Sequence, residues 1–84
     1  MGYLEEHRAS RLKVGDKVIV TRKAKSEENG WCNGWDSSMD CLVGKTCTIT
    51  VDNLEYGFSL NDSGYDFPYF ILEPVDKKIS FLDI

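Results

Sequence analysis

The sequence predicts a small all-β domain, a five-stranded antiparallel SH3-like barrel with a long loop between strands 1 and 2. Its 84 residues suffice for one globular domain and not for two. Short β-branched runs alternate with glycine, asparagine and aspartate turn signals, without a sustained helical period or a repeat. Curling so short a sheet onto itself hides its edges, which favours a barrel.

The first strand is expected at 18–22, where a β-branched run follows the turn at Gly15-Asp16. Residues 1–10 before it are polar, with room for one frayed helical turn. Residues 23–40 after it are too rich in glycine for a strand and too aromatic for a linker. A long ordered loop is therefore expected there, and such loops are usually functional or folded over the core.

The second and third strands follow from the next runs of the chain. A glycine turn and a β-rich stretch occupy 42–51, and this stretch ends at the turn-prone Asp52-Asn53. A short aromatic run at 56–60 is the third strand.

The last two strands are set by a turn and by a proline. The 61–64 segment has strong hairpin-turn chemistry, so 65–67 is expected to return antiparallel as the fourth strand. Pro68 ends it, and 69–71 is expected to form a single helical turn. The apolar-polar alternation of 72–75 predicts the fifth strand.

These elements divide the chain into a polar segment at 1–11, the barrel at 12–75, and a C-terminal tail or extra edge strand at 76–84. The expected core comes from the inward positions of the strands and of the helical turn. It consists of Leu12, Val18, Val20, Val43, Ile49, Val51, Phe58, Leu60, Phe67, Ile71 and Leu72.

Charge and composition exclude several classes of function. Ten basic and fourteen acidic residues give a net charge of −4 and a sequence pI near 4.8, so direct binding to DNA or RNA is not expected. No apolar run approaches the roughly 20 residues that a membrane span needs. The first residues lack the pattern of a secretory signal, so a cytoplasmic location is expected, in a host cell if the protein is encoded by a phage.

Neither the cysteines nor the carboxylates predict a reactive centre. Cys32, Cys41 and Cys47 are odd in number and lack zinc-ligand spacing, so no disulfide framework, metal or cofactor is expected. Cys47 is predicted to lie in the core or at its flank, and Cys32 is predicted to be the more exposed thiol. The aspartate pairs of the chain are interpreted as turn formers and solvated charges. Without a nucleophile-base pair, the sequence does not predict an enzyme.

Five segments in a fixed order carry a resemblance to a known family. They are Val14-Gly15-Asp16-Lys17-Val18, Trp35 with Met39, Val43-Gly44-Lys45, Tyr65-Asp66-Phe67-Pro68, and Leu72-Glu73-Pro74-Val75. Their order resembles the Mind bomb/HERC type of SH3-like repeat, and also small single-domain proteins of tailed bacteriophages, over most of the chain. The eukaryotic repeats are peptide-binding modules of larger ligases, so the resemblance implies recognition and not catalysis. The chain departs from the repeats where Tyr65 replaces a common tryptophan.

The aromatic residues of the loop and of the fourth strand are the candidates for contact with a partner. Trp31, flanked by glycine and polar residues, is predicted to be exposed, whereas Trp35 is predicted to plug the core together with Met39. The full set of candidate partner-binding residues is Trp31, Trp35, Asp36, Met39, Tyr65 and Tyr69.

The sequence thus predicts a non-enzymatic binding module, a phage-type accessory protein that binds and modulates a host protein or peptide. Aromatic rings among acidic side chains suit a basic or proline-rich peptide. The alternative is a protein that binds or sequesters a nucleotide or cyclic dinucleotide and acts against host defence. In that case the rings stack on the base, and Lys23, Lys25 and Lys45 bind the phosphates.

Overall fold

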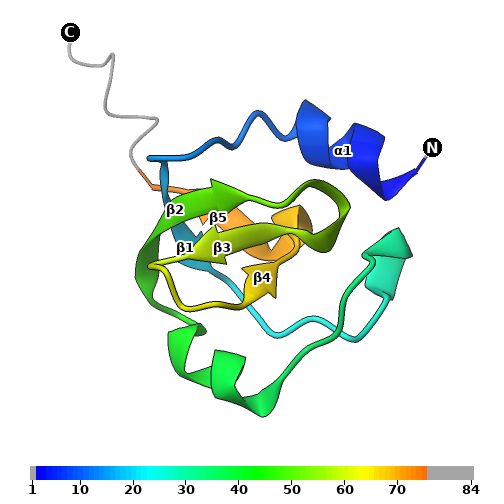
Figure 1. Ribbon diagram of the computed structural model, residues 1–84. Coiled ribbons are helices and arrows are strands. Elements are labelled where there is room, and N and C mark those ends of the chain that lie inside the picture. The colour runs from blue at the N-terminus through cyan, green and yellow to red at the C-terminus, as the bar shows by residue number, and fades with distance from the viewer. Residues whose placement is uncertain (1, 76–84) are drawn as a thin grey trace, which may run out of the picture.

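The computed structural model describes residues 2–75, which form a five-stranded antiparallel sheet (Figure 1). The strands are β1 (Lys17–Val20), β2 (Thr46–Asp52), β3 (Phe58–Leu60), β4 (Asp66–Phe67) and β5 (Leu72–Pro74). Their order in the sheet is β4-β3-β2-β1-β5, which confirms the small all-β antiparallel fold. The sheet is not closed between β4 and β5, so a barrel is not confirmed. The strand or tail expected at 76–84 lies outside the described residues.

Strand register places the core and explains one wrong prediction. Val18 pairs with Cys47 of β2 and with Pro74 of β5, and the alternation along β1 buries Val18 and Val20. In β2 the register against β3 shifts between Ile49 and Val51, which marks a β-bulge. Ile49 is fully buried, but Val51 is 43% exposed. The prediction of Val51 as core is therefore wrong, because the extra residue breaks the period-2 alternation.

Most of the expected core is confirmed. The buried members are Val18, Val20, Ile49, Phe58, Leu60, Phe67, Ile71 and Leu72. Two further members of the expected set, Leu12 and Val43, are only half-buried and pack against this core. The core also contains side chains from outside the strands, namely Tyr3, Ala24, Trp31 and Met39. Segments read as polar from the sequence thus close over the sheet.

The N-terminal segment is not a frayed turn but the helix α1 (Tyr3–Ala9), which lies beside the β2–β3 hairpin (Figure 1). Its Tyr3 and His7 are buried one turn apart, on the same face of the helix. The His7 ring stacks on Phe58 with 4.1 Å between ring centroids. Within residues 2–75, no helix has the length and apolar character that a membrane crossing requires.

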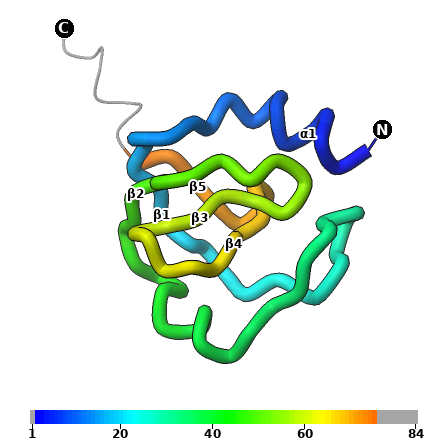
Figure 2. Tube along the Cα trace, viewed as in Figure 1, coloured from blue at the N-terminus to red at the C-terminus, as the bar shows by residue number. Residues whose placement is uncertain are grey.

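The long loop between the first two strands is confirmed, and it runs around one side of the sheet (Figure 2). It contains two short 3-10 helices, η1 (Glu28–Gly30) and η2 (Ser37–Leu42). Its far end returns to β1, where the Gly44 N–H donates to the Val20 carbonyl at 2.7 Å. Two more 3-10 turns follow, η3 (Leu54–Tyr56) and η4 (Tyr69–Ile71), and η4 is the helical turn predicted after Pro68.

Candidate functional site

The first half of the loop is anchored by Trp31. Its side chain is 1% exposed, and its indole N–H donates to the Tyr56 carbonyl at 2.6 Å. The next amide, of Cys32, donates to the Glu55 carbonyl at 3.2 Å. The prediction that Trp31 is an exposed partner contact is therefore wrong. Its polar neighbours suggested exposure, but the ring fills the space between the loop and the η3 turn.

The second half of the loop presents Trp35 at the surface. The half-buried ring meets Phe67 edge-on, with centroids 5.7 Å apart and an interplanar angle of 87°. Its indole N–H donates to Asp40 Oδ1 at 2.7 Å, and its backbone N–H donates to Ser26 Oγ at 3.2 Å. Trp35 thus packs on the core without entering it fully, so the prediction that it plugs the core holds only in part.

The helix η2 positions the acidic residues next to this ring. Asp36 caps η2, because its Oδ1 accepts from the Ser38 N–H at 2.8 Å. Met39, in the same turn, is buried, which excludes it as a partner contact. Asp36 and Asp40 are exposed. Trp35, Asp36 and Asp40 form the surface that we call the loop site.

The remaining predicted aromatic residues lie elsewhere. Tyr69 packs against Tyr3, with centroids 5.1 Å apart, and against Phe70 at 5.3 Å. Burial raises the pKa of Tyr69 above its usual value. Tyr65 is half-buried directly before β4 and packs against the core. Within residues 2–75 no ring contact joins either tyrosine to Trp35, so the structure does not gather the predicted set into one site.

The lysines predicted to bind phosphate are also dispersed. Lys23, Lys25 and Lys45 are all exposed. Lys23 Nζ lies 3.7 Å from Asp40 Oδ2, so its charge is opposed by a carboxylate of the loop site. The structure shows no contact that brings Lys25 or Lys45 to the same place within the described chain. A phosphate bound by all three is therefore not supported by their arrangement.

An ion pair holds the start of the loop in place. Arg22 Nη2 donates to Glu28 Oε2 at 3.0 Å, and its guanidinium lies 5.5 Å from the centroid of the Phe70 ring. Hydrogen bonds from Arg22 and then from the Lys25 amide lower the pKa of Glu28. These contacts close the loop onto η4, so they are structural.

A buried polar chain fastens α1 to the sheet. The Tyr69 N–H donates to the Tyr3 hydroxyl at 3.2 Å, and the hydroxyl lies 3.4 Å from His7 Nδ1. His7 Nε2 is 2.8 Å from Asp52 Oδ1. Every buried polar side-chain atom of this polar chain has a partner. His7 is 2% exposed, so it fixes the helix and is closed to a substrate.

The cysteines do not form a centre. Cys47 is buried and Cys32 is exposed, as predicted. Burial raises the pKa of the Cys47 thiol, which keeps it protonated and unreactive. Within the part of the chain that the structure describes, no group of three histidine, cysteine or acidic side chains is placed to hold a metal ion.

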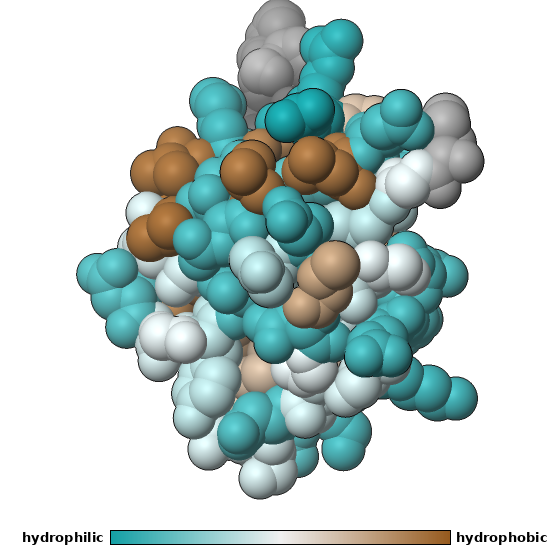
Figure 3. All heavy atoms as spheres, turned by 45° about the vertical axis from the view of Figure 1, so that its right-hand side comes forward, coloured by the Kyte–Doolittle hydropathy of each residue, from teal (hydrophilic) through white to brown (hydrophobic). Residues whose placement is uncertain are grey.

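A second exposed surface lies on the β2–β3 hairpin. Its large apolar side chains, Val51, Leu54 and Tyr56, are between 43% and 50% exposed, and we call them the hairpin surface. Figure 3 shows that apolar residues gather on one part of the molecular face among hydrophilic ones. Tyr56 is the exposed aromatic ring there, so it offers a natural comparison for Trp35.

No family model, curated protein or solved structure matches the chain. The resemblance to the Mind bomb/HERC repeats and to small phage proteins therefore stays a prediction. The function is inferred from the geometry of the loop site.

Proposed function

We propose that the protein is a non-enzymatic binding module that holds an extended, basic peptide segment of a partner protein on the loop site. The observation that supports this most is the fixed, half-buried ring of Trp35. Phe67 meets the ring in a T-shaped contact, and Asp40 accepts a hydrogen bond from its indole N–H. A tryptophan held in this way presents a large surface at little further entropic cost, which is why tryptophan dominates many protein interfaces.

The charge of the loop site selects the chemistry of the partner. Asp36 is exposed and the side chain of Asp40 is 47% exposed, and both follow Trp35 in the chain, at the start of η2 and within it. A lysine or arginine of a bound peptide gains Coulomb attraction from these carboxylates and can stack on the indole. Lys23 is the local competitor, and its pairing with Asp40 at 3.7 Å is loose enough for a peptide cation to replace it.

Proline in the peptide would strengthen this interaction. A proline-rich segment is already extended, so it loses little entropy on binding, and its rings pack on aromatic faces. The partner we favour is a host protein, and occupancy of its peptide segment is the means of modulating it. Closure of the sheet into an SH3-like barrel stays a prediction within this proposal.

Nucleotide binding at the loop site is the weaker alternative. Stacking on Trp35 is possible for a base, but the adjacent carboxylates repel its phosphates. Lys23 is already opposed by Asp40. The acidic surroundings of the ring therefore favour a basic peptide over a nucleotide.

The proposal is tested by selecting a library of random peptides against the folded protein. We expect selected peptides enriched in lysine, arginine and proline. The variant Trp35→Ala should bind a selected peptide more weakly by about 2 kcal/mol, as expected for a central aromatic contact. The matched control is Tyr56→Ala, which removes an exposed ring from the hairpin surface and should leave binding unchanged.

Two outcomes contradict the proposal. Selected peptides without basic residues would show that the carboxylates do not choose the partner. Loss of binding in Tyr56→Ala, with binding retained in Trp35→Ala, would move the site to the hairpin surface. Circular dichroism of both variants verifies that each is folded.

A further inference from the structure

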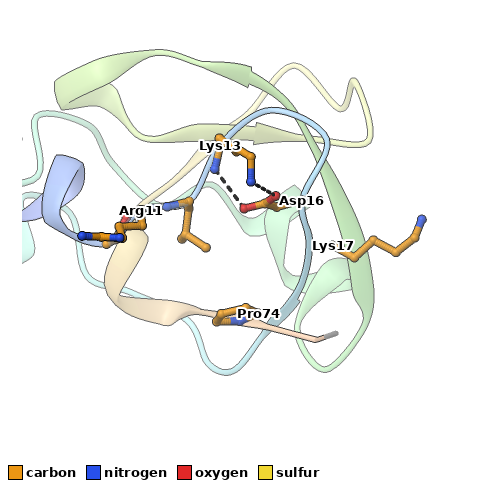
Figure 4. A pocket seen from close by; sticks show the side chains of 7 residues that line it. Arg11, Lys13, Asp16, Lys17 and Pro74 are labelled. Atoms are coloured by element: carbon orange, nitrogen blue, oxygen red, sulfur yellow. Dashed lines mark hydrogen bonds and ion pairs between the residues drawn. The ribbon is translucent and has the colours of Figure 1, made fainter. Parts of the chain in front are cut away.

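The pocket between α1 and β1 does not gather its charged side chains at one point (Figure 4). It has a volume of about 260 Å³, and Lys13 Nζ at its wall donates to Asp16 Oδ1 at 3.1 Å. Arg11 and Lys17 point away from each other at its opposite ends. These charges therefore do not converge on one ligand. The long loop, in contrast, brings together two groups that can react with each other.

Two asparagine-glycine pairs lie in this loop, and they differ in their local structure. Asn29 is exposed and Asn33 is half-buried, so exposure alone favours reaction at Asn29. The Gly34 N–H, however, donates to Oδ1 of Asn33 at 2.9 Å. The Gly30 N–H, which follows Asn29, is instead directed at the Glu27 carbonyl at 3.4 Å, in the 3-10 helix η1. Of the two pairs, Asn33–Gly34 is the one in which the side-chain amide meets the next backbone nitrogen.

Hydrogen bonds on both sides hold the Asn33–Gly34 peptide in this arrangement. The Asn33 carbonyl accepts from the Glu27 N–H at 3.0 Å, and the Trp35 N–H donates to Ser26 Oγ at 3.2 Å. A Cβ atom added at Gly34 would lie 2.9 Å from Ser26 Oγ, so the close approach requires glycine. Glycine also leaves its nitrogen unshielded by a side chain. The loop thus fixes an unhindered nitrogen beside an amide carbon.

We propose that Asn33 is a site of spontaneous deamidation in the folded protein. The Gly34 nitrogen loses its proton to a solvent base and attacks Asn33 Cγ, which forms the N–Cγ bond of a succinimide ring. The Cγ–Nδ2 bond breaks, and the side-chain nitrogen gains a proton and leaves as ammonia. Water then adds to one ring carbonyl and opens the ring, which leaves aspartate or isoaspartate. Contact between the two groups favours ring closure, and water is the co-reactant.

The reaction changes the charge of the loop site. Each conversion replaces a neutral amide by a carboxylate two residues before Trp35. The loop site already carries the exposed side chains of Asp36 and Asp40. Deamidation should therefore strengthen the attraction of a basic peptide, a consequence that rests on the proposed function. Asn33 thus provides a slow, one-way increase in the negative charge of this surface.

Peptide mapping by mass spectrometry tests the proposal on the full chain, incubated in mildly alkaline buffer. In the folded protein we expect Asn33 to convert at least about tenfold faster than Asn29, because contact accelerates ring closure. In concentrated urea both asparagines precede glycine without fixed geometry, so they should convert at similar rates. Asn29 is therefore a matched control within the same loop. A ratio of the two rates that is no larger in the folded protein than in urea would overturn the proposal.

A second measurement separates the modification from the proposed function. Asn33→Asp carries the charge of the aspartate product and should bind a selected basic peptide about twofold more tightly than the unchanged protein. Asn29→Asp makes the same change in net charge and should leave the affinity unchanged. Equal affinities of the two variants would overturn the role of Asn33 in recognition. If no peptide is selected at all, the proposed function fails, and the mapping still decides whether Asn33 deamidates.

Discussion

The two tryptophans of the long loop are four residues apart and occupy opposite environments. Trp31 is 1% exposed and donates its indole N–H to a backbone carbonyl of the η3 turn. Trp35 is half-buried and donates to a side-chain carboxylate at the surface. A buried ring whose donor is satisfied by backbone supports the fold, whereas a supported ring beside exposed acids can meet a partner. One loop thus contains an anchor and a contact surface.

The largest effect should come from removing the anchor. Trp31→Ala empties a buried site and should lower the free energy of unfolding by about 3–5 kcal/mol. The total free energy of unfolding of a small domain is only about 5–15 kcal/mol, so the variant should be close to unfolding at room temperature. Urea denaturation measures the loss. A loss below about 1 kcal/mol would contradict the burial of Trp31.

Alkaline pH should weaken the buried half of the loop through Tyr3, which lies against it. Gly30 of the loop lies directly against Tyr3, because a Cβ atom added at Gly30 would be 3.4 Å from the Cβ of Tyr3. Burial raises the pKa of Tyr3 well above its usual value, so the folded state keeps the hydroxyl proton that the unfolded chain loses. The contribution of Tyr3 to stability should therefore be unaffected below about pH 10 and should fall as pH rises above it.

Denaturation midpoints measured from about pH 9 to about pH 11 test this expectation. Tyr3→Phe should cost about 1–2 kcal/mol at neutral pH, because it removes the partner of the Tyr69 N–H, and it should reduce the alkaline loss, which Tyr69 and Cys47 continue to cause in part. The control Tyr56→Phe changes an exposed tyrosine and should keep the full slope. An unchanged slope in Tyr3→Phe would show that Tyr3 is not responsible.

Removing the contact ring should cost the fold less than removing the anchor. Trp35→Ala exposes one edge of Phe67 and should lower the free energy of unfolding by about 1 kcal/mol. The decisive quantity is the difference between the losses in free energy of unfolding that Trp35→Ala and Trp31→Ala cause in the same urea experiment. If Trp35→Ala destabilises the domain as much as Trp31→Ala does, both rings belong to the core, and the proposal that Trp35 contacts a partner is contradicted.

The smallest effect is expected from removing the negative charge of Asp40. Asp40→Asn keeps an oxygen that can accept from the Trp35 indole N–H but removes the charge. Stability should change by less than about 0.5 kcal/mol, and the affinity for a selected basic peptide should fall by about 0.5–1 kcal/mol. Titration calorimetry with the selected peptide at low and high salt measures the change in affinity. An affinity equal to that of the unchanged protein at low salt would remove Asp40 from recognition.

The sequence predicted the sheet well because strands and turns leave local patterns. The β-branched run at β1, the turn at 61–64 and the stop at Pro68 each act within a few residues, and all three are present in the structure. The burial of Val51 was wrongly predicted because a bulge changes the pairing of β2 against β3, and no residue type in the sequence indicates that shift. Patterns of period 2 predict burial only where the pairing is regular.

The candidate site was predicted only in part, for a different reason. Trp35 and Asp36 were named and are together, but Trp31 and Met39 are buried. The burial of Trp31 depends on a carbonyl 25 residues away, and that of His7 on a carboxylate 45 residues away. Such long-range partners have no periodic signal. The polar neighbours of Trp31 therefore predict exposure, and the polar residues 1–10 predict a frayed turn where the structure has a helix.

Hydrogen exchange of the two indole N–H groups in the unmodified protein distinguishes the buried Trp31 from Trp35 at the surface without any mutation. Both signals appear in one NMR spectrum, and Trp31→Phe and Trp35→Phe assign them. We expect slow exchange for Trp31, whose buried N–H donates to the Tyr56 carbonyl, and fast exchange for Trp35 at the surface, slowed when a selected peptide is added. Fast exchange for Trp31 together with slow exchange for Trp35 in the absence of peptide would contradict it.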